Sequence, residues 1–373
     1  MQLFALVFCS VYALVQLYLY YKIRAAFPAI GFWSVPVVLF LGMMVFAPIG
    51  VRVLDTAGYP RMALAMSTPA HSWLAIMLWF LTLSLACDGW NLAAQGLSRL
   101  SPVIRQLVVS PKGALAISGV LILAAASWGM HEASSVRLKQ LTLTLRNLPK
   151  GTKPIRLVQI SDMHLGLFMR EKMLMRVVGL INEARPDVLV STGDLVDSSF
   201  HQPKLAVHLA MIKAPLGKYA VFGNHEAYAG ISGSMEFHQA AGFRVLRGDS
   251  VLVAPGLRIA GVDDPACAGN PHGVILDGGF VANPAGEAMV LLKHRSRVGK
   301  EHTFDLQLSG HTHGGQIFPW IWVLKLVDTY TAGLYKFADG SSLYVSNGTG
   351  TWGPPMRLFA PPEVTLIILQ PEG

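Results

Sequence analysis

The sequence predicts two successive parts of different fold class, an all-α transmembrane region followed by an α/β layered domain. The first observation is composition, since the 373 residues are 52% hydrophobic and only 14% charged, which is too apolar for an ordinary soluble chain. The second is that residues 1–130 hold seven Lys or Arg, two Asp and no Glu. The third is a series of short β-type runs beyond that point, with a helical pattern among them.

The N-terminal part contains four apolar runs of the length needed to cross the hydrocarbon core of a bilayer. They lie at roughly Leu3–Tyr21, Phe32–Ile49, Trp73–Ala86 extended by its flanks, and Ala114–Met130. Asp88 shortens the third run, so a buried helix is an alternative there. We therefore expect a transmembrane region of about four helices over residues 1–132.

The loops between these runs differ in positive charge. The first and third loops hold five basic residues and the second holds two, namely Lys22, Arg24, Arg99, Arg105 and Lys112 against Arg52 and Arg61. Positive loops favour the cytoplasmic side of a membrane. Because an even number of spans puts both ends on one side, we expect the C-terminal domain to lie outside the cytoplasm.

Net charge and cysteine content exclude two other classes. Of the net charge of +8, the first 130 residues contribute +5, and the remaining +3 is too little for a nucleic-acid-binding stripe. The three cysteines, Cys9, Cys87 and Cys267, form no pattern of a disulfide framework or a Cys-rich zinc site.

The remainder of the chain shows strand signals. Val136–Leu145 alternates like a half-buried strand, and the turn-rich stretch Asn147–Pro154 follows it, so residues 133–153 are expected to form a connecting strand and linker before a domain at 154–373. Apolar β-type runs then recur at Arg156–Ile160, Asp187–Val190, Tyr219–Phe222, Leu257–Ile259, Met289–Leu292, Leu306–Leu308 and Ser342–Val345.

One helical pattern lies between the first two of these runs. Arg170–Ala184 carries Leu174, Val177, Val178 and Ile181 at helical spacing. Strands that alternate with helices predict the α/β layered architecture.

Polar clusters follow five of the predicted strands. They are Asp162-Met-His164, Gly193-Asp194-Leu-Val-Asp197, Gly223-Asn-His-Glu226, Lys293-His294 and Gly310-His-Thr-His-Gly-Gly315. One such cluster is commonly only a turn Asp and a solvated His, but ligands bind at the carboxyl ends of strands in open α/β sheets. Asp, Asn and His groups in this number suit two borderline cations that share one carboxylate.

The order of these clusters along residues 150–373 resembles the calcineurin-like metallophosphoesterase family. The motifs that carry the resemblance are D-x-H, G-D-x-x-D, G-N-H-E, a lone His and G-H-T-H-G-G-Q. The later Gly333-Leu-Tyr and Ser346-Asn-Gly-Thr-Gly350 resemble its membrane-associated bacterial branch. That branch includes phosphodiesterase-like proteins and enzymes similar to UDP-diacylglucosamine hydrolases of lipid A synthesis.

The resemblance implies a fold and a ligand set. The fold is a sandwich of two mixed β-sheets flanked by helices, with two divalent metal ions, Mn, Fe or Zn, at one rim. Residue by residue, the family pattern assigns Asp162, His164 and His313 to the first metal, Asn224, His294 and His311 to the second, and Asp194 to both.

The resemblance also implies catalytic roles beside the metals. His225 resembles the acid that protonates the leaving oxygen, and Asp197 resembles the carboxylate that orients it. Without the resemblance, His225 could also be a histidine that supports a neighbouring metal ligand and takes no part in proton transfer. Glu226 is expected to be structural.

Three positions depart from the family pattern or leave two readings open. Ser198 stands where the protein-phosphatase branch has an Arg that grips phosphate, which disfavours protein phosphatase activity. Arg295 either contacts substrate or caps a solvated loop. The aromatic stretch Ile317–Leu324 is either part of the core or an exposed segment suited to a membrane interface.

These observations predict a membrane-anchored enzyme of the bacterial inner membrane. We expect it to hydrolyse a phosphodiester or pyrophosphate bond of a lipid or lipid-linked substrate by attack of a metal-bound hydroxide. One alternative is a UDP-diacylglucosamine pyrophosphate hydrolase, which would meet its substrate on the cytoplasmic face. Another is a membrane receptor or scaffold with a vestigial esterase domain, although no ligand of the pattern is missing. A transporter would need charges within the spans, which are almost absent apart from Asp88.

Overall fold

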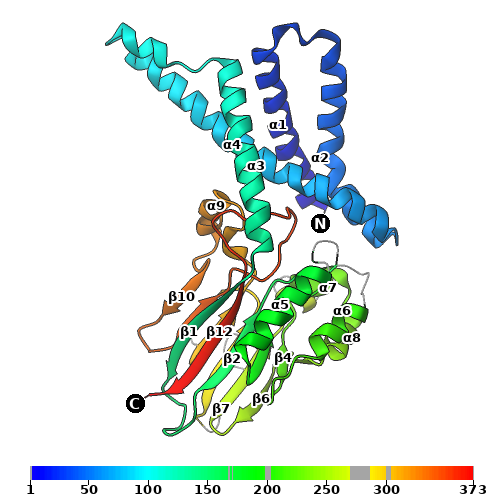
Figure 1. Cartoon of the computed structure of the whole chain (residues 1–373), viewed down its shortest axis with the longest axis vertical. Helices are drawn as coiled ribbons and strands as arrows, with labels where there is room; N and C mark the ends of the chain where they lie inside the picture. Colours follow the sequence, from blue (N-terminus) through cyan, green and yellow to red (C-terminus); the bar gives the residue numbers. More distant parts are fainter. Residues whose placement is uncertain are drawn as a thin grey trace. The chain divides into compact units, whose positions relative to one another are not determined.

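The computed structural model describes residues 2–166, 169, 171–197, 203–268, 286–299 and 304–372. The chain divides into two compact units, Met1–Gly129 and Met130–Gly373. The first is helical and the second is built on two β-sheets (Figure 1).

Four long helices make up the first unit, the last of which runs on into the second unit. They are α1 (Gln2–Ala26), α2 (Ser34–Thr56), α3 (Pro60–Leu97) and α4 (Pro111–Ser134), with the short 3-10 turns η1 (Pro28–Trp33) and η2 (Pro102–Leu107) between them. Each of the four contains a segment long and apolar enough to cross a membrane, in agreement with the four predicted spans.

Asp88 does not end the third of these helices. It lies inside the continuous helix α3. Its carboxylate accepts hydrogen bonds from the Lys22 ammonium and the Tyr18 hydroxyl of α1. An ion pair with a helix neighbour lowers the cost of a carboxylate among apolar residues, so the third run is a full-length helix.

The second unit contains two mixed six-stranded sheets. The first has the order β1 (Arg137–Leu145), β12 (Glu363–Pro371), β2 (Ile155–Ile160), β3 (Val188–Ser191), β4 (Lys218–Ala220) and β5 (Arg244–Val245). The second has the order β10 (Gly333–Lys336), β11 (Ser342–Val345), β9 (Leu306–Ser309), β8 (Ala288–Lys293), β7 (Leu257–Val262) and β6 (Asp249–Ala254).

Pairing directions make both sheets mixed. In the first sheet β12 runs parallel to β1 and antiparallel to β2, while β2, β3, β4 and β5 are parallel. In the second, β11, β9, β8 and β7 are parallel, and the edge strands β10 and β6 are antiparallel to their neighbours. This confirms the two mixed sheets that the family resemblance implied.

The β2 strand shows how the layers are held together. Leu157 belongs to the core between the two sheets, together with Ile259 and Leu308 of the second sheet. Its neighbour Val158 points the other way, into the core between the first sheet and the helices. Alternate residues of a strand face opposite sides, so β2 is buried on both faces.

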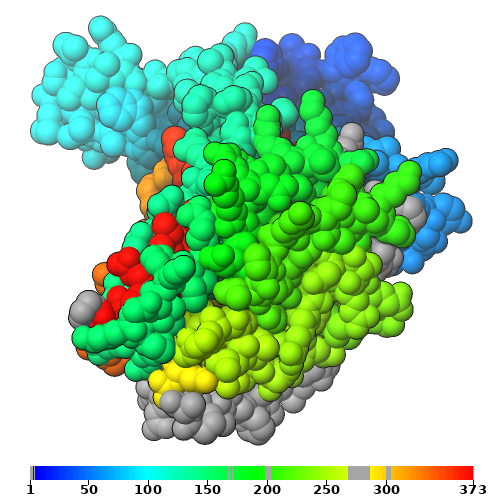
Figure 2. All heavy atoms as spheres, turned by 60° about the horizontal axis from the view of Figure 1, so that its bottom comes forward, coloured from blue at the N-terminus to red at the C-terminus, as the bar shows by residue number. Residues whose placement is uncertain are grey.

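Helices cover the outer face of the first sheet (Figure 1). They are α5 (Glu171–Ala184), α6 (Pro203–Ala210), α7 (Asn224–Ala229) and α8 (Ile231–Ala240). The helix-spaced apolar residues predicted at Arg170–Ala184 are those that α5 buries. The edge strand β1 and its neighbour β12, teal and red, lie side by side at the surface in Figure 2.

All seven predicted β-type runs overlap strands, which are β2, β3, β4, β7, β8, β9 and β11. The half-buried strand predicted at Val136–Leu145 is β1. The sequence reading did not identify β12, which lies between β1 and β2 and joins them into one sheet.

Candidate metal centre

The five polar clusters converge at one rim of the sandwich. Each directly follows a strand: β2, β3, β4, β8 or β9. Six of the seven predicted ligands are buried, and His311 is half-buried. Three groups of His and carboxylate side chains there have ligand atoms within 4.8 Å of one another, a spacing that could hold a metal ion.

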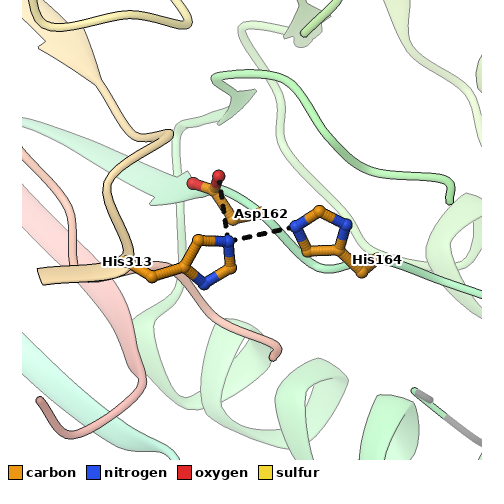
Figure 3. A group of neighbouring side chains, drawn as sticks. All are labelled: Asp162, His164 and His313. Carbon is orange, nitrogen blue, oxygen red and sulfur yellow. Dashed lines mark hydrogen bonds and ion pairs between the residues drawn. The ribbon is translucent and has the colours of Figure 1, made fainter. Parts of the chain in front are cut away.

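Asp162, His164 and His313 form the first group (Figure 3). The Nε2 atoms of His164 and His313 face one another at 3.1 Å, and Nε2 of His313 lies 3.6 Å from Oδ1 of Asp162. Two nitrogens that each lie about 2.0–2.1 Å from one ion would be about 3 Å apart at a right angle. The spacing therefore fits two ligands of a single cation.

Asp194, His294 and His311 form the second group. Nε2 of His294 lies 3.1 Å from Nδ1 of His311 and 3.1 Å from Oδ2 of Asp194. The same Oδ2 atom lies 3.9 Å from Nε2 of His164 in the first group. The Asp194 carboxylate thus lies between the two groups, where a shared ligand is required.

Asn224 is the remaining predicted ligand. Its Oδ1 atom is buried and has no hydrogen-bond partner among the described residues. An unpaired buried carbonyl costs about 1–3 kcal/mol, so its position calls for a partner that the chain itself does not supply. A cation beside Asp194 and His294 would be such a partner.

The electrostatics of the rim also suit cations. Burial alone would lower the pKa of His294, but Asp194 and Asp162 raise it to about 10, so the negative potential that stabilises a proton on this ring would also stabilise a metal cation that replaces the proton. Burial and the nearby His294 lower the pKa of His311 to about 3, so its ring stays neutral with a free lone pair. Metal ligation requires neutral imidazole and ionised carboxylate.

Backbone strain is concentrated at the predicted ligands. Left-handed φ values, rare outside glycine, occur at five of the seven: Asp162 (52°), His164 (50°), Asp194 (53°), His311 (73°) and His313 (51°). Each costs on the order of 1–2 kcal/mol, and such outliers gather at functional sites.

Two glycines allow the loops to approach this closely. A Cβ atom at Gly223 would lie 2.1 Å from Oδ1 of Asp194, and one at Gly310 would lie 2.1 Å from Oδ2 of Asp162. Both contacts are impossible for any other residue, so the glycines of the G-N-H-E and G-H-T-H patterns make room for the carboxylates.

Glu226 organises the loops as a structural residue. Its fully buried carboxylate accepts backbone N–H groups of Asp194 at 2.9 Å, Leu195 at 2.7 Å and Gly223 at 2.8 Å. Burial, followed by the neighbouring Asp194 carboxylate, raises the pKa of Glu226 to about 7. It therefore joins the loop after β3 to the loop after β4.

His225 and Asp197 form a pair beside the ligands. Nδ1 of His225 is hydrogen-bonded to Oδ1 of Asp197, which also lies 3.7 Å from Nδ1 of His164. Burial alone would lower the pKa of His225, but the carboxylates of Asp197 and Asp194 raise it to about 9. The ring of Trp352, which is 53% exposed, lies edge-on to the His225 ring at 5.7 Å between centroids.

Two further residues of the rim were not identified from the sequence. Arg357 is fully buried, and its guanidinium donates to the carbonyl oxygens of Asn347, Gly350 and Ala360. Trp352 borders His225. Both lie in the loop before β12, and the G-T-G350 pattern that precedes them is the signal that marks this loop.

Arg295 is paired with a buried carboxylate. Its Nε and Nη2 atoms bind Asp264 at 2.6 and 3.3 Å, and its side chain is about one-third exposed. Ser198, the other departure from the family pattern, lies outside the described residues.

Comparison with known proteins agrees with this geometry. A family model described as calcineurin-like phosphoesterase matches residues 155–315, which include all seven predicted ligands. A metallophosphoesterase of Aquifex aeolicus is 41% identical over 248 residues, which cover 65% of this chain and 95% of that protein. The chain belongs to the calcineurin-like metallophosphoesterase family. As a member of this family it is a metal-dependent phosphoesterase.

Other metallophosphoesterases that resemble the chain carry membrane regions or further sequence. A transmembrane protein with metallophosphoesterase domain from Danio rerio is 32% identical over 274 residues, covering 69% of this chain and 62% of that protein. A metallophosphoesterase of Helicobacter pylori is 32% identical over 232 residues, covering 61% of this chain and 62% of that protein. The chain thus spans less than two thirds of these two relatives.

Proposed function

We propose that the chain is a membrane-anchored dinuclear phosphoesterase that hydrolyses a phosphodiester or pyrophosphate bond of a lipid or lipid-linked substrate. The observation that carries the proposal is the position of Asp194 between the two ligand groups, with Oδ2 3.1 Å from Nε2 of His294 and 3.9 Å from Nε2 of His164. Asp162, His164 and His313 would hold one cation, and Asn224, His294 and His311 the other.

Two adjacent cations supply one kind of chemistry: together they acidify a water molecule and neutralise charge on the phosphoryl oxygens. The chain keeps the ligands in place before any ion arrives. The backbone N–H of His225 donates to Oδ1 of Asp194 at 2.9 Å, and Nδ1 of His294 is 2.9 Å from the carbonyl oxygen of Thr192. Such outer contacts fix the orientation of each ligand.

His225 is the proposed acid. Because its Nδ1 atom is hydrogen-bonded to Asp197, its Nε2 atom is the one that can carry a proton to the leaving oxygen. Asp197 holds the ring and stabilises its positive charge, as a carboxylate does in other His–carboxylate pairs. His225 therefore acts on the departing group and Asp197 acts through His225.

Arg295 is the proposed contact to the substrate phosphate. Asp264 occupies its Nε and Nη2 edge, and its Nη1 atom has no hydrogen bond among the described residues. It lies close enough to the site to lower the pKa of His311. A guanidinium held by a carboxylate on one edge can present the other to a phosphate oxygen.

The four apolar helices support a membrane-bound location for the substrate. We place the phosphoesterase unit outside the cytoplasm of a bacterial inner membrane, since the loop charge bias favours that side. The partners of the enzyme are then the membrane and a phosphorylated lipid-linked molecule.

The experiment that tests the function is a hydrolysis screen of the detergent-purified chain with added Mn²⁺. Aryl monoesters, aryl diesters and lipid pyrophosphates are compared under one condition. We expect turnover of diesters or pyrophosphates that stops when a chelator is added. Absence of turnover on all three classes, with two ions bound, would contradict the proposal.

A further inference from the structure

Helix α9 (Trp320–Val327) exposes an unusually apolar surface in the described part of the second unit. Five of its eight side chains are 43–84% exposed, and Phe359 of the loop before β12 is 72% exposed. We call this set the α9 surface: Trp320, Trp322, Val323, Leu326, Val327 and Phe359. Lys325 is the single charged residue of the helix. Contiguous exposed apolar side chains of this kind mark an interaction site.

The α9 surface is attached rigidly to the turn that carries the metal ligand His313. A Cβ atom at Gly315, two residues after His313, would lie 2.7 Å from the Cα atom of Ile321 in α9. Phe318 packs edge-on against both Trp322 and Phe359, with centroid distances of 4.8 and 5.7 Å. The surface therefore cannot shift without moving the ligand turn.

The same turn connects the α9 surface to the candidate acid. The Gln316 side chain donates to the carbonyl oxygen of Trp352 at 2.8 Å and accepts its backbone N–H at 2.9 Å. Trp352 in turn packs its ring against His225. Exposed aromatic side chains thus lie both beside the reacting centre and on α9.

The chain itself indicates what covers this surface. The apolar helix α4 ends at Ser134 and strand β1 begins at Arg137, so only two residues separate a membrane-spanning candidate from the phosphoesterase unit. Such a tether keeps the unit within reach of lipid at all times. Trp and Phe rings with a nearby Lys have the composition of segments that lie at the membrane–water interface.

We propose that the α9 surface inserts into the interfacial layer of the phospholipid bilayer and so presents the metal centre to phosphates at the level of the lipid headgroups. The inference rests on the proposed function for the identity of the substrate, but the contact with lipid stands on the exposed side chains and the tether. The phosphate of a lipid then reaches the rim while its acyl chains remain in the bilayer.

Photo-crosslinking of the full chain tests the contact directly. A diazirine amino acid replaces Leu326 in α9. The matched control carries it in place of Leu252, which is also exposed. Leu252 lies in β6, at the opposite edge of the second sheet from β10, the strand that follows α9. The protein is reconstituted in vesicles of phosphatidylcholine and phosphatidylglycerol, irradiated, and analysed by mass spectrometry.

We expect lipid adducts at position 326 and none at position 252. An adduct at 326 with a second copy of the chain, or equal yields of lipid adduct at the two positions, overturns the proposal. Because crosslinking needs no turnover, its result is independent of whether the proposed reaction takes place.

A kinetic comparison tests the consequence for the reaction. The double variant Leu326→Ser/Val327→Ser, at the two most exposed side chains of α9, is assayed on phosphatidyl-p-nitrophenol in vesicles and on soluble bis-p-nitrophenyl phosphate, which share a leaving group. Loss of two exposed apolar side chains that would insert into lipid should lower kcat/KM on the vesicle substrate at least about tenfold and leave kcat/KM on the soluble substrate unchanged. Equal losses of kcat/KM on both substrates would contradict insertion of the α9 surface into lipid. A wild-type protein that is inactive on both substrates would contradict the proposed function but not the lipid contact.

Discussion

Nη2 of Arg357 lies 3.1 Å from Nδ1 of His313. The same guanidinium donates to the carbonyl oxygen of His313 at 3.3 Å, so one buried arginine holds the backbone of a candidate metal ligand and lies against its ring. Burial lowers the pKa of Arg357 to about 10, which leaves it charged at neutral pH. Burial, followed by His164 and Arg357, lowers the pKa of His313 well below its ordinary value and keeps its ring neutral.

Replacement of this guanidinium should therefore destabilise the phosphoesterase unit. Arg357→Met leaves buried carbonyl oxygens without donors, and we expect a loss of about 3 kcal/mol in the free energy of unfolding. Thermal unfolding in detergent measures it as a fall in Tm of several degrees. Arg244→Gln, at an exposed ion pair with Asp249, is the control and should change stability by less than about 0.5 kcal/mol. Equal Tm values for the two variants would refute the role of Arg357.

Loss of the Asp194 carboxylate, which we propose to be shared by two metal ions, should abolish turnover. Asp194→Ala removes an oxygen that lies near both ligand groups, and His313→Ala removes one nitrogen of the first group. We expect at least a roughly thousandfold lower kcat for each, with fewer metal ions per chain by elemental analysis. Asp249→Ala, at an exposed carboxylate, should retain both. Near wild-type turnover of Asp194→Ala with a full metal complement would rule out the assignment.

The His225 and Asp197 pair should matter most when the leaving group is poor. His225→Asn removes the proposed proton donor, so alkyl esters should lose about 10²–10⁴ in rate while p-nitrophenyl esters, whose leaving group needs no proton, lose far less. Asp197→Asn should show the same selectivity, because it acts through His225. Equal losses on both ester types would point to a role in metal positioning instead.

Arg295 should affect substrate binding more than turnover. Arg295→Gln should raise KM for phosphoesters about tenfold with a smaller change in kcat, since a charge-assisted phosphate contact is lost. Arg297→Gln, on the same loop and exposed, is the matched control. An unchanged KM for Arg295→Gln would contradict the phosphate contact and would mean that Arg295 serves only as the structural partner of Asp264.

The side of the membrane is tested by reporters fused after Gly373. A protein that fluoresces only in the cytoplasm should stay dark, and alkaline phosphatase, active only outside, should give signal. The opposite pattern would reject the outside placement and bring the nucleotide-linked pyrophosphate substrate to first place.

The amino-acid sequence determined the features that depend on neighbours along the chain. Apolar runs of membrane-crossing length, strand-type runs and the polar clusters after them are local patterns, and they identified four long helices, eight strands and the five polar clusters of the rim. The helical spacing of Leu174, Val177 and Ile181 likewise predicted the buried face of α5, because a helix repeats within a few residues.

Only the tertiary structure decided what depends on residues far apart. Strand β12 joins β1 to β2 across more than two hundred residues of sequence, and no local pattern specifies such a pairing. Arg357 is buried because the fold places its guanidinium against the turn that carries His313, 44 residues earlier in the chain, although a lone Arg in sequence predicts a solvated surface. The exposure of Trp322 was equally undecided, since an apolar helix reads the same in a core or on a surface until its neighbours are placed.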